Sequence, residues 1–149
     1  MSERMPRQQI YQLQPALSQA LNSLDKTAAD SQFPPLLVHL VKLRASQLNG
    51  CAFCQRMHAQ EARSDGEDQL RLDLLAAWHE IDGIFDKRER AALVWTEILT
   101  QVASAPIADS QYAQLAEQYS EKEIVDLTSL IIAINGWNRV AIAFHLQPI

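Results

Sequence analysis

The sequence predicts an all-α protein, and three features of the chain support this fold class. Apolar residues recur three and four positions apart through most of the chain, which is the spacing that lines one face of a helix. No segment alternates apolar and polar residues as a half-buried strand would. Proline is absent between Leu36 and Ala105, where Gly50, Gly66 and Gly83 divide the chain into pieces of helical length.

The first half of the chain predicts helices over residues 15–29, 35–49, 51–64 and 67–80. Pro35 suits the first position of the second helix, because the N–H that proline lacks would have no helical partner there. The Asn-Gly pair at 49–50 predicts the end of that helix, since glycine readily adopts the left-handed conformation that closes a helix.

The second half contains two capping-box patterns, in which a short polar residue is followed three positions later by glutamate. They are Asp86 with Glu89 and Ser120 with Glu123. A further helix is expected to begin at Asp109 or Ser110. The helices predicted in this half cover residues 87–103, 109–119, 121–135 and 137–146, and Pro148 ends the last one.

A second Asn-Gly pair at 135–136 resembles the first. "LVKLRASQLNG" and "LTSLIIAINGW" each predict an apolar helix that ends at Asn-Gly and is followed at once by another helix. The repetition suggests a duplicated helical hairpin within a single domain spanning residues 1–149. The second copy has Trp137 where the first has Cys51, so it carries none of the thiol chemistry.

Composition excludes several classes of function. The net charge of −5 and the absence of a Lys/Arg cluster argue against a nucleic-acid partner. The longest apolar run, "LIIAI" at 130–134, is too short to span a membrane, and the polar N-terminus does not resemble a signal peptide. A cytoplasmic location is therefore expected. A close cysteine pair in that compartment is more often catalytic, redox-sensing or metal-binding than structural.

The only two cysteines of the chain lie in "NGCAFCQRMH" at 49–58. On a helix that opens at Cys51, the side chains of Cys51, Cys54 and His58 form one stripe, because residues three and four apart share a face. One helical turn also supplies the Cα separation that a disulfide needs, about 4.4–6.8 Å. A helix N-terminus and a nearby histidine both lower the pKa of a thiol, so the spacing favours a redox-active dithiol.

Two other interpretations of this stripe remain open. The cysteines could be small buried apolar residues. They could also bind zinc together with His58, and His39 or His79 would then supply a fourth ligand. A second CxxC or HxxxH pair, which structural zinc sites usually have on a separate element, is missing from the sequence.

The stretch "SQLNGCAFCQRMH" resembles the alkyl hydroperoxidase D branch of the carboxymuconolactone decarboxylase-like superfamily, over residues 36–100 and more loosely to the C-terminus. The resemblance implies an all-helical fold that assembles into homo-oligomers, either trimers or hexamers. It also implies that Cys54 is oxidised to sulfenic acid, that Cys51 resolves it, and that His58 belongs to a proton relay. Decarboxylation belongs to a branch that lacks this cysteine pair.

The chain departs from the family pattern at two positions. The family usually has a glutamate of the relay twelve residues before the first cysteine, and that position is His39 here. Phe53 stands where the best-known branch has a histidine. His39 could still accept a proton but cannot supply a fixed negative charge to orient His58. Glu61, seven residues after Cys54, is expected to be a surface charge.

Together these observations predict a cysteine-based antioxidant peroxidase or disulfide reductase. It would reduce hydroperoxides through Cys54, Cys51, His58 and His39, with no metal, haem or flavin cofactor. An external dithiol, of the thioredoxin or lipoyl type, would reduce the resulting disulfide. The alternative is a thiol redox sensor or binding protein without catalytic turnover, in which the same disulfide changes a surface that a partner recognises.

Overall fold

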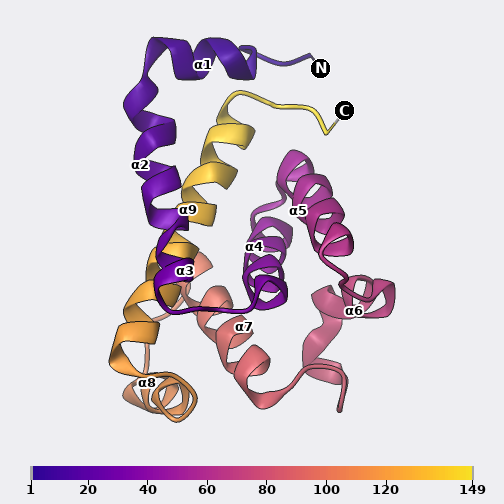
Figure 1. Cartoon of the computed structure of the whole chain (residues 1–149), viewed down its shortest axis with the longest axis vertical. Coiled ribbons are helices and arrows are strands. Elements are labelled where there is room, and N and C mark those ends of the chain that lie inside the picture. The colour runs from indigo at the N-terminus through magenta and orange to yellow at the C-terminus, as the bar shows by residue number, and fades with distance from the viewer. Residues whose placement is uncertain (1, 149) are drawn as a thin grey trace.

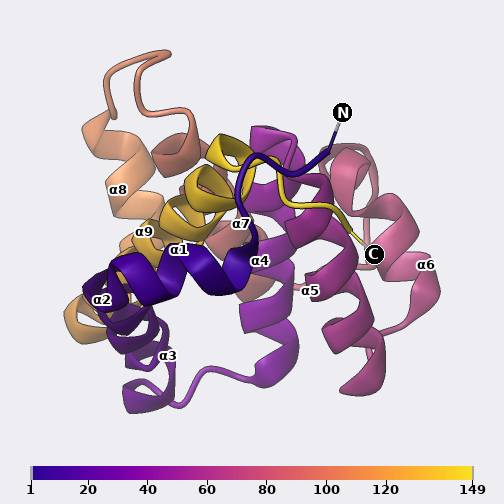
Figure 2. The same ribbon diagram turned by 90° about the horizontal axis from the view of Figure 1, so that it is seen from above.

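The computed structural model describes residues 2–148 and confirms the all-α fold, because no strand occurs in that range. Two views of the chain show how the helices are arranged (Figures 1 and 2). The elements in chain order are α1 (Arg7–Leu13), α2 (Pro15–Asp25), α3 (Thr27–Asp30), α4 (Pro35–Asn49), α5 (Ala52–Ser64), α6 (Gln69–Leu74), the 3₁₀ helix η1 (Leu75–Glu80), α7 (Lys87–Thr100), α8 (Asp109–Ala116) and α9 (Glu121–Ala143).

Helix α4 lies at the centre of the fold and packs against α5, α7 and α9. Leu37 and Val41 face a core shared with α7, α8 and α9, whereas Leu40 and Leu43 face a second core shared with α5, α6, η1 and α7. Because it buries more than one face, α4 shows little of the one-sided pattern of a surface helix. Its contacts on several sides fix the position from which α4 leads into α5.

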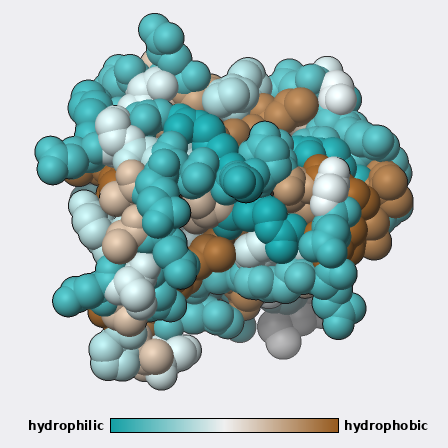
Figure 3. All heavy atoms as spheres, turned by 90° about the horizontal axis from the view of Figure 1, so that it is seen from below, coloured by the Kyte–Doolittle hydropathy of each residue, from teal (hydrophilic) through white to brown (hydrophobic). Residues whose placement is uncertain are grey.

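One face of the surface that encloses these cores is mostly hydrophilic. On the face in Figure 3, hydrophilic side chains predominate, and hydrophobic side chains form separate patches, including one at the right edge of the view. No helix within residues 2–148 is both long enough and apolar enough to cross a bilayer.

Both predicted capping boxes are present. Glu89 N–H donates to Asp86 Oδ1 at 2.8 Å, and Asp86 N–H donates to Glu89 Oε2 at 3.0 Å. Ser120 and Glu123 make the same reciprocal pair at 3.2 and 3.0 Å. The starts of α7 and α9 are confirmed because a capping box depends only on residues close in sequence.

Several predicted boundaries differ from the structure. The helix expected over 15–29 is divided at Lys26 into α2 and α3, and the segment 67–80 is α6 followed by η1, with Ala77 outside the helical region (φ −117°, ψ 24°). Helix α7 ends at Thr100 rather than at 103, and α1 was not predicted at all. These segments lack strong sequence stops, and their ends are determined by tertiary packing.

The predicted break at Asn135-Gly136 is wrong, because α9 runs without interruption through both residues. Gly136 lies where α2 approaches α9 closely: a Cβ atom at this position would be 2.5 Å from Leu21 Cδ2. The glycine thus allows helix contact instead of ending a helix. The two Asn-Gly pairs have different conformations, and they provide no support for a duplicated hairpin.

Gly50, in contrast, ends α4 as predicted, with φ 68° and ψ 31°. No atom lies within 4 Å of a Cβ built there, so the cost of another residue would come from the backbone conformation alone. We expect Gly50→Ala to lower the free energy of unfolding by about 1 kcal/mol, and Gly50→Asn to lower it less, because asparagine tolerates the left-handed region better than alanine does. Urea unfolding followed by circular dichroism measures both. Equal stability of the alanine variant and the parent would contradict this account.

Candidate active site

The site begins at the turn between α4 and α5. After Gly50, the N–H of Cys51 donates to the carbonyl of Ser46 at 3.0 Å, which closes the end of α4. Cys51 then has extended backbone angles and caps α5, and its Sγ accepts from the N–H of Cys54 at 3.2 Å. The turn therefore places one cysteine at the cap of α5 and the other in the first helical turn, where backbone N–H groups and the helix dipole favour a thiolate.

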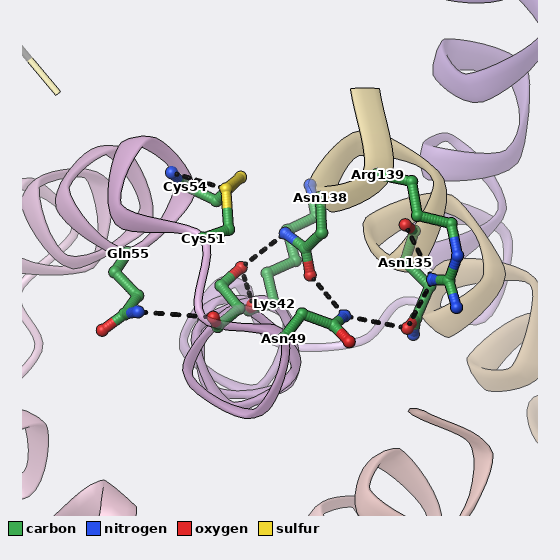
Figure 4. Close-up of a disulfide and its surroundings, with 9 residues drawn as sticks. Lys42, Asn49, Cys51, Cys54, Gln55, Asn135, Asn138 and Arg139 are labelled. Atoms are coloured by element: carbon green, nitrogen blue, oxygen red, sulfur yellow. Dashed lines mark hydrogen bonds between the residues drawn. A yellow bond between two sulfur atoms is a disulfide. The ribbon is translucent and has the colours of Figure 1, made fainter. Parts of the chain in front are cut away.

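Cys51 and Cys54 form a disulfide with a Cα–Cα distance of 5.3 Å, within the range expected from the sequence (Figure 4). Both residues are buried, each with 2% exposure. They pack in a small apolar cluster that joins the two ends of the chain, with Ile10 from α1 and Val140 and Leu146 from the C-terminal region. The disulfide therefore lies under the N- and C-terminal segments and not on an open surface.

A buried polar network ties this turn to α9. Asn138, which is fully buried, donates to Ser46 Oγ at 3.0 Å and accepts from Asn49 Nδ2 at 2.9 Å (Figure 4). Asn49 Nδ2 also donates to Asn135 Oδ1 at 3.0 Å. The network holds the last turns of α4 against α9. The sequence marks Asn49 and Asn135 only as parts of Asn-Gly pairs, and it gives no sign that they meet Asn138.

A cavity of about 220 Å³ reaches Cys54 and His58 but not Cys51. It is smaller than most small-molecule pockets, which have volumes of about 300–1,000 Å³. Arg7 extends over the ring of Phe53, with its guanidinium carbon 5.8 Å from the ring centroid. The other lining residues, from α1, α2, α4, α5 and the C-terminal region, are Tyr11, Asn22, Asp25, Lys42, Met57, Glu61, Trp137, Ala141 and Leu146.

His58 lies one helical turn after Cys54 and is 4% exposed. Its Nδ1 is 3.2 Å from Glu61 Oε2, and its buried Nε2 has no hydrogen-bond partner within residues 2–148. The hydrogen bond with His58 holds the pKa of Glu61 below its usual value, which already lies well below neutral pH. Glu61, expected to be only a surface charge, therefore contacts the predicted relay histidine.

His39 is on α4 and makes a different contact. Its Nε2 is 2.6 Å from Asp65 Oδ2, at the end of α5, and no hydrogen bond joins it to His58. The structure thus brings together Cys51, Cys54 and His58, while His39 faces a neighbouring carboxylate. His79, the other possible zinc ligand, lies elsewhere: it stacks on Trp78 and bonds Glu97 at 2.6 Å. Among residues 2–148, no three His, Cys, Asp or Glu side chains lie close enough to hold a metal ion together.

The polar network suggests a direct test. We expect Asn138→Leu to lower the free energy of unfolding by about 1–3 kcal/mol. Leucine can neither donate to Ser46 Oγ nor accept from Asn49 Nδ2, so both groups would lose a partner at a fully buried position. Ser129→Ala on the same helix is the control. The Ser129 hydroxyl bonds only the Val125 carbonyl of its own helix, so its loss should change stability by less than about 0.5 kcal/mol. Equal urea midpoints for the two variants would show that the network contributes nothing.

Comparison with known proteins agrees with this geometry. The family model described as the carboxymuconolactone decarboxylase family matches residues 15–97. The uncharacterized protein YdfG of Bacillus subtilis is 37% identical over 143 residues, which cover 96% of this chain and 95% of YdfG.

Solved structures extend the comparison. A protein of unknown function from Agrobacterium tumefaciens, whose description suggests an AhpD antioxidant defence role, superposes with a TM-score of 0.88 at 35% identity, covering 98% of this chain and 97% of that one. The debrominase Bmp8 shares the fold, with a TM-score of 0.78 at 21% identity over 91% of this chain and 72% of its own. The chain therefore belongs to the carboxymuconolactone decarboxylase family, in its AhpD-like branch.

Proposed function

We propose that the chain is a thiol-dependent peroxidase of the AhpD type in which Cys54 attacks the peroxide. The observation that carries this proposal is the one-sided access to the cysteine pair: the cavity reaches Cys54 and His58, and Cys51 lies behind it. A substrate that enters the cavity meets only one of the two sulfurs. This agrees with the role of Cys54 that the family resemblance implies.

In the reduced protein, His58 is the proton acceptor for Cys54. Its Nε2 has no partner within the described chain and lies on the helical face that Cys54 shares. The Cys54 thiolate attacks one oxygen of ROOH, the O–O bond breaks, and the leaving oxygen takes up a proton to give ROH. The product at Cys54 is a sulfenic acid. Cys51 then displaces its hydroxyl as water, which gives the disulfide.

The walls of the cavity favour an organic hydroperoxide. Tyr11, Phe53, Met57 and Trp137 present apolar surface, and Tyr11 meets Trp137 edge to face with ring centroids 6.1 Å apart. These side chains form the apolar part of a lining that also contains charged groups. An apolar region of this kind is typical of a site that binds an organic molecule. An apolar substituent on the peroxide gains contacts here that hydrogen peroxide cannot make.

The same access restricts the reductant. A thiolate of an external dithiol attacks Cys54 Sγ through the cavity and releases Cys51 as thiolate. The second thiol of the reductant then displaces Cys54, and the reductant leaves as a disulfide. Because both cysteines are 2% exposed, a dithiol on a slender lipoyl-type arm fits this path better than the broad surface of a thioredoxin-type protein.

Turnover with an organic hydroperoxide and a small dithiol tests the proposal. We expect Cys54→Ser to abolish peroxide consumption. Without added dithiol, Cys51→Ser should permit one stoichiometric turnover and leave a sulfenic acid on Cys54, because the resolving thiol is gone. Peroxide loss over time and dimedone labelling measure the two effects, with the double-serine variant as the blank.

Two outcomes would contradict this assignment. Sulfenic acid formed on Cys51 in the Cys54→Ser variant at the parental rate would mean that the two roles are reversed. A disulfide that forms and is reduced without catalytic turnover would favour the redox-sensor alternative.

We also propose that the chain forms a homo-oligomer, either a trimer or a hexamer as in its family. Val125 and Ile132 lie seven residues apart on α9 and are 62% and 54% exposed. Val102, which lines a surface pocket together with Ile132, is 58% exposed. Apolar surface of this kind suits an interface between subunits. Light scattering at micromolar concentration should give a mass well above that of one chain, 16.8 kDa, and the single-chain mass would contradict the assembly.

A further inference from the structure

The two ring nitrogens of His58 have different surroundings. Nδ1 faces the Glu61 carboxylate at 3.2 Å, whereas Nε2 is buried and has no partner in the described chain. A carboxylate at Nδ1 accepts its proton and so leaves Nε2 as the unprotonated acceptor of the neutral ring. This is the form that can take a proton from a neighbouring thiol.

In the family pattern, the carboxylate of the relay comes from the position twelve residues before the first cysteine, but in this chain that position carries no carboxylate. His39 occupies it, and the ring of His39 is bonded to Asp65 at 2.6 Å. The only carboxylate that bonds His58 within residues 2–148 comes from Glu61, three residues further along α5 itself.

We infer that Glu61 is the positioning residue of the thiol relay: it orients His58 and stabilises its protonated form, so that the acid lies on α5 rather than on α4. This inference rests on the proposed function, in which His58 accepts the proton of Cys54. The relay then runs along one helix, from Cys54 to His58 to Glu61, at spacings of four and three residues.

The electrostatic effect of Glu61 has a definite sign. A carboxylate beside the ring favours the imidazolium, and the imidazolium favours the Cys54 thiolate. A glutamate is ordinarily ionised at neutral pH, and the hydrogen bond with His58 lowers the pKa of Glu61 further. Since the Glu61 side chain is 50% exposed, water screens the interaction and the effect should be moderate.

Other charged groups near His58 are engaged elsewhere or are further away. Lys42 and Asp25 pair with each other at 3.2 Å, and Asp25 also accepts from Trp137 Nε1 at 2.8 Å. The titratable and charged groups that face the relay from neighbouring elements are Arg7 and Tyr11 on α1, Asp25 on α2, His39 and Lys42 on α4, and Asp65 at the end of α5.

The pH dependence of Cys54 alkylation tests the inference. In a Cys51→Ser parent, Cys54 is the only thiol, and the serine hydroxyl can accept from the Cys54 N–H as the Cys51 sulfur does. We expect Glu61→Gln to shift the iodoacetamide profile to higher pH and to slow alkylation at neutral pH roughly two- to fivefold, with full recovery at alkaline pH. Glu61→Ala should show at least the same shift. The shift of the alkylation profile in His58→Ala gives the effect of losing the whole relay, with which the Glu61 variants are compared.

Glu117→Gln, at the exposed residue directly after α8, is the matched control for the loss of one negative charge, and it should follow the parent. Unchanged profiles in both Glu61 variants, with parental circular dichroism, would overturn the inference. So would a shift in His39→Asn without one in the Glu61 variants, since the relay would then pass through α4. Alkylation does not require peroxide turnover. If the unsubstituted chain fails to consume peroxide while Glu61→Gln shifts the alkylation profile of the Cys51→Ser parent, the proposed function is contradicted and the role of Glu61 is not.

Discussion

Gly50 leaves the right-handed helical region at the end of α4, and the positions of both cysteines depend on that one backbone conformation. The positive φ of Gly50 turns the chain so that the Cys51 N–H donates to the Ser46 carbonyl at the end of α4. The Cys51 sulfur then accepts from the Cys54 N–H at the start of α5. Gly50 is the C-cap of α4, and the next residue is already the N-cap of α5. So short a turn requires a residue that adopts positive φ readily. The Asn138 network then holds this turn against α9, so that the site is built on rigid helices and not on a mobile loop.

Features of the chain that depend on residues close in sequence could be predicted. The ends marked by the Asp86–Glu89 and Ser120–Glu123 boxes are confirmed because each box forms within a single helical turn. The stripe of Cys51, Cys54 and His58 was predictable for the same reason, since a helix brings residues three and four apart together. The all-α class required only the period of the apolar residues.

Features that depend on contacts between distant segments could not be predicted. From the sequence, Gly136 is predicted to end a helix. In the structure it lies inside α9 and allows Leu21 of α2 to pack closely against the helix. The sequence alone does not distinguish these two uses of glycine. The packing of Ile10 and Val140 around the disulfide also could not be predicted, because these two residues are far apart in the sequence. Glu61 differs from these cases: its spacing of three from His58 is visible in the sequence, whereas the family pattern places the acid of the relay at position 39.

The two sides of the cysteine pair have separate tasks in the proposed reaction. Cys54 faces the cavity, where the peroxide enters, and Cys51 lies on the protein side, behind the helical turn. A sulfenic acid formed at Cys54 therefore meets its resolving thiol from within the fold, whereas a second peroxide must enter the cavity again. The resolving thiol is held one helical turn away, so its effective concentration is far higher than that of any peroxide in solution. In the proposed reaction, this geometry favours disulfide formation over further oxidation of Cys54. A site with Cys54 alone would lack this protection, which is a physical reason for a second cysteine at the cap of the same helix.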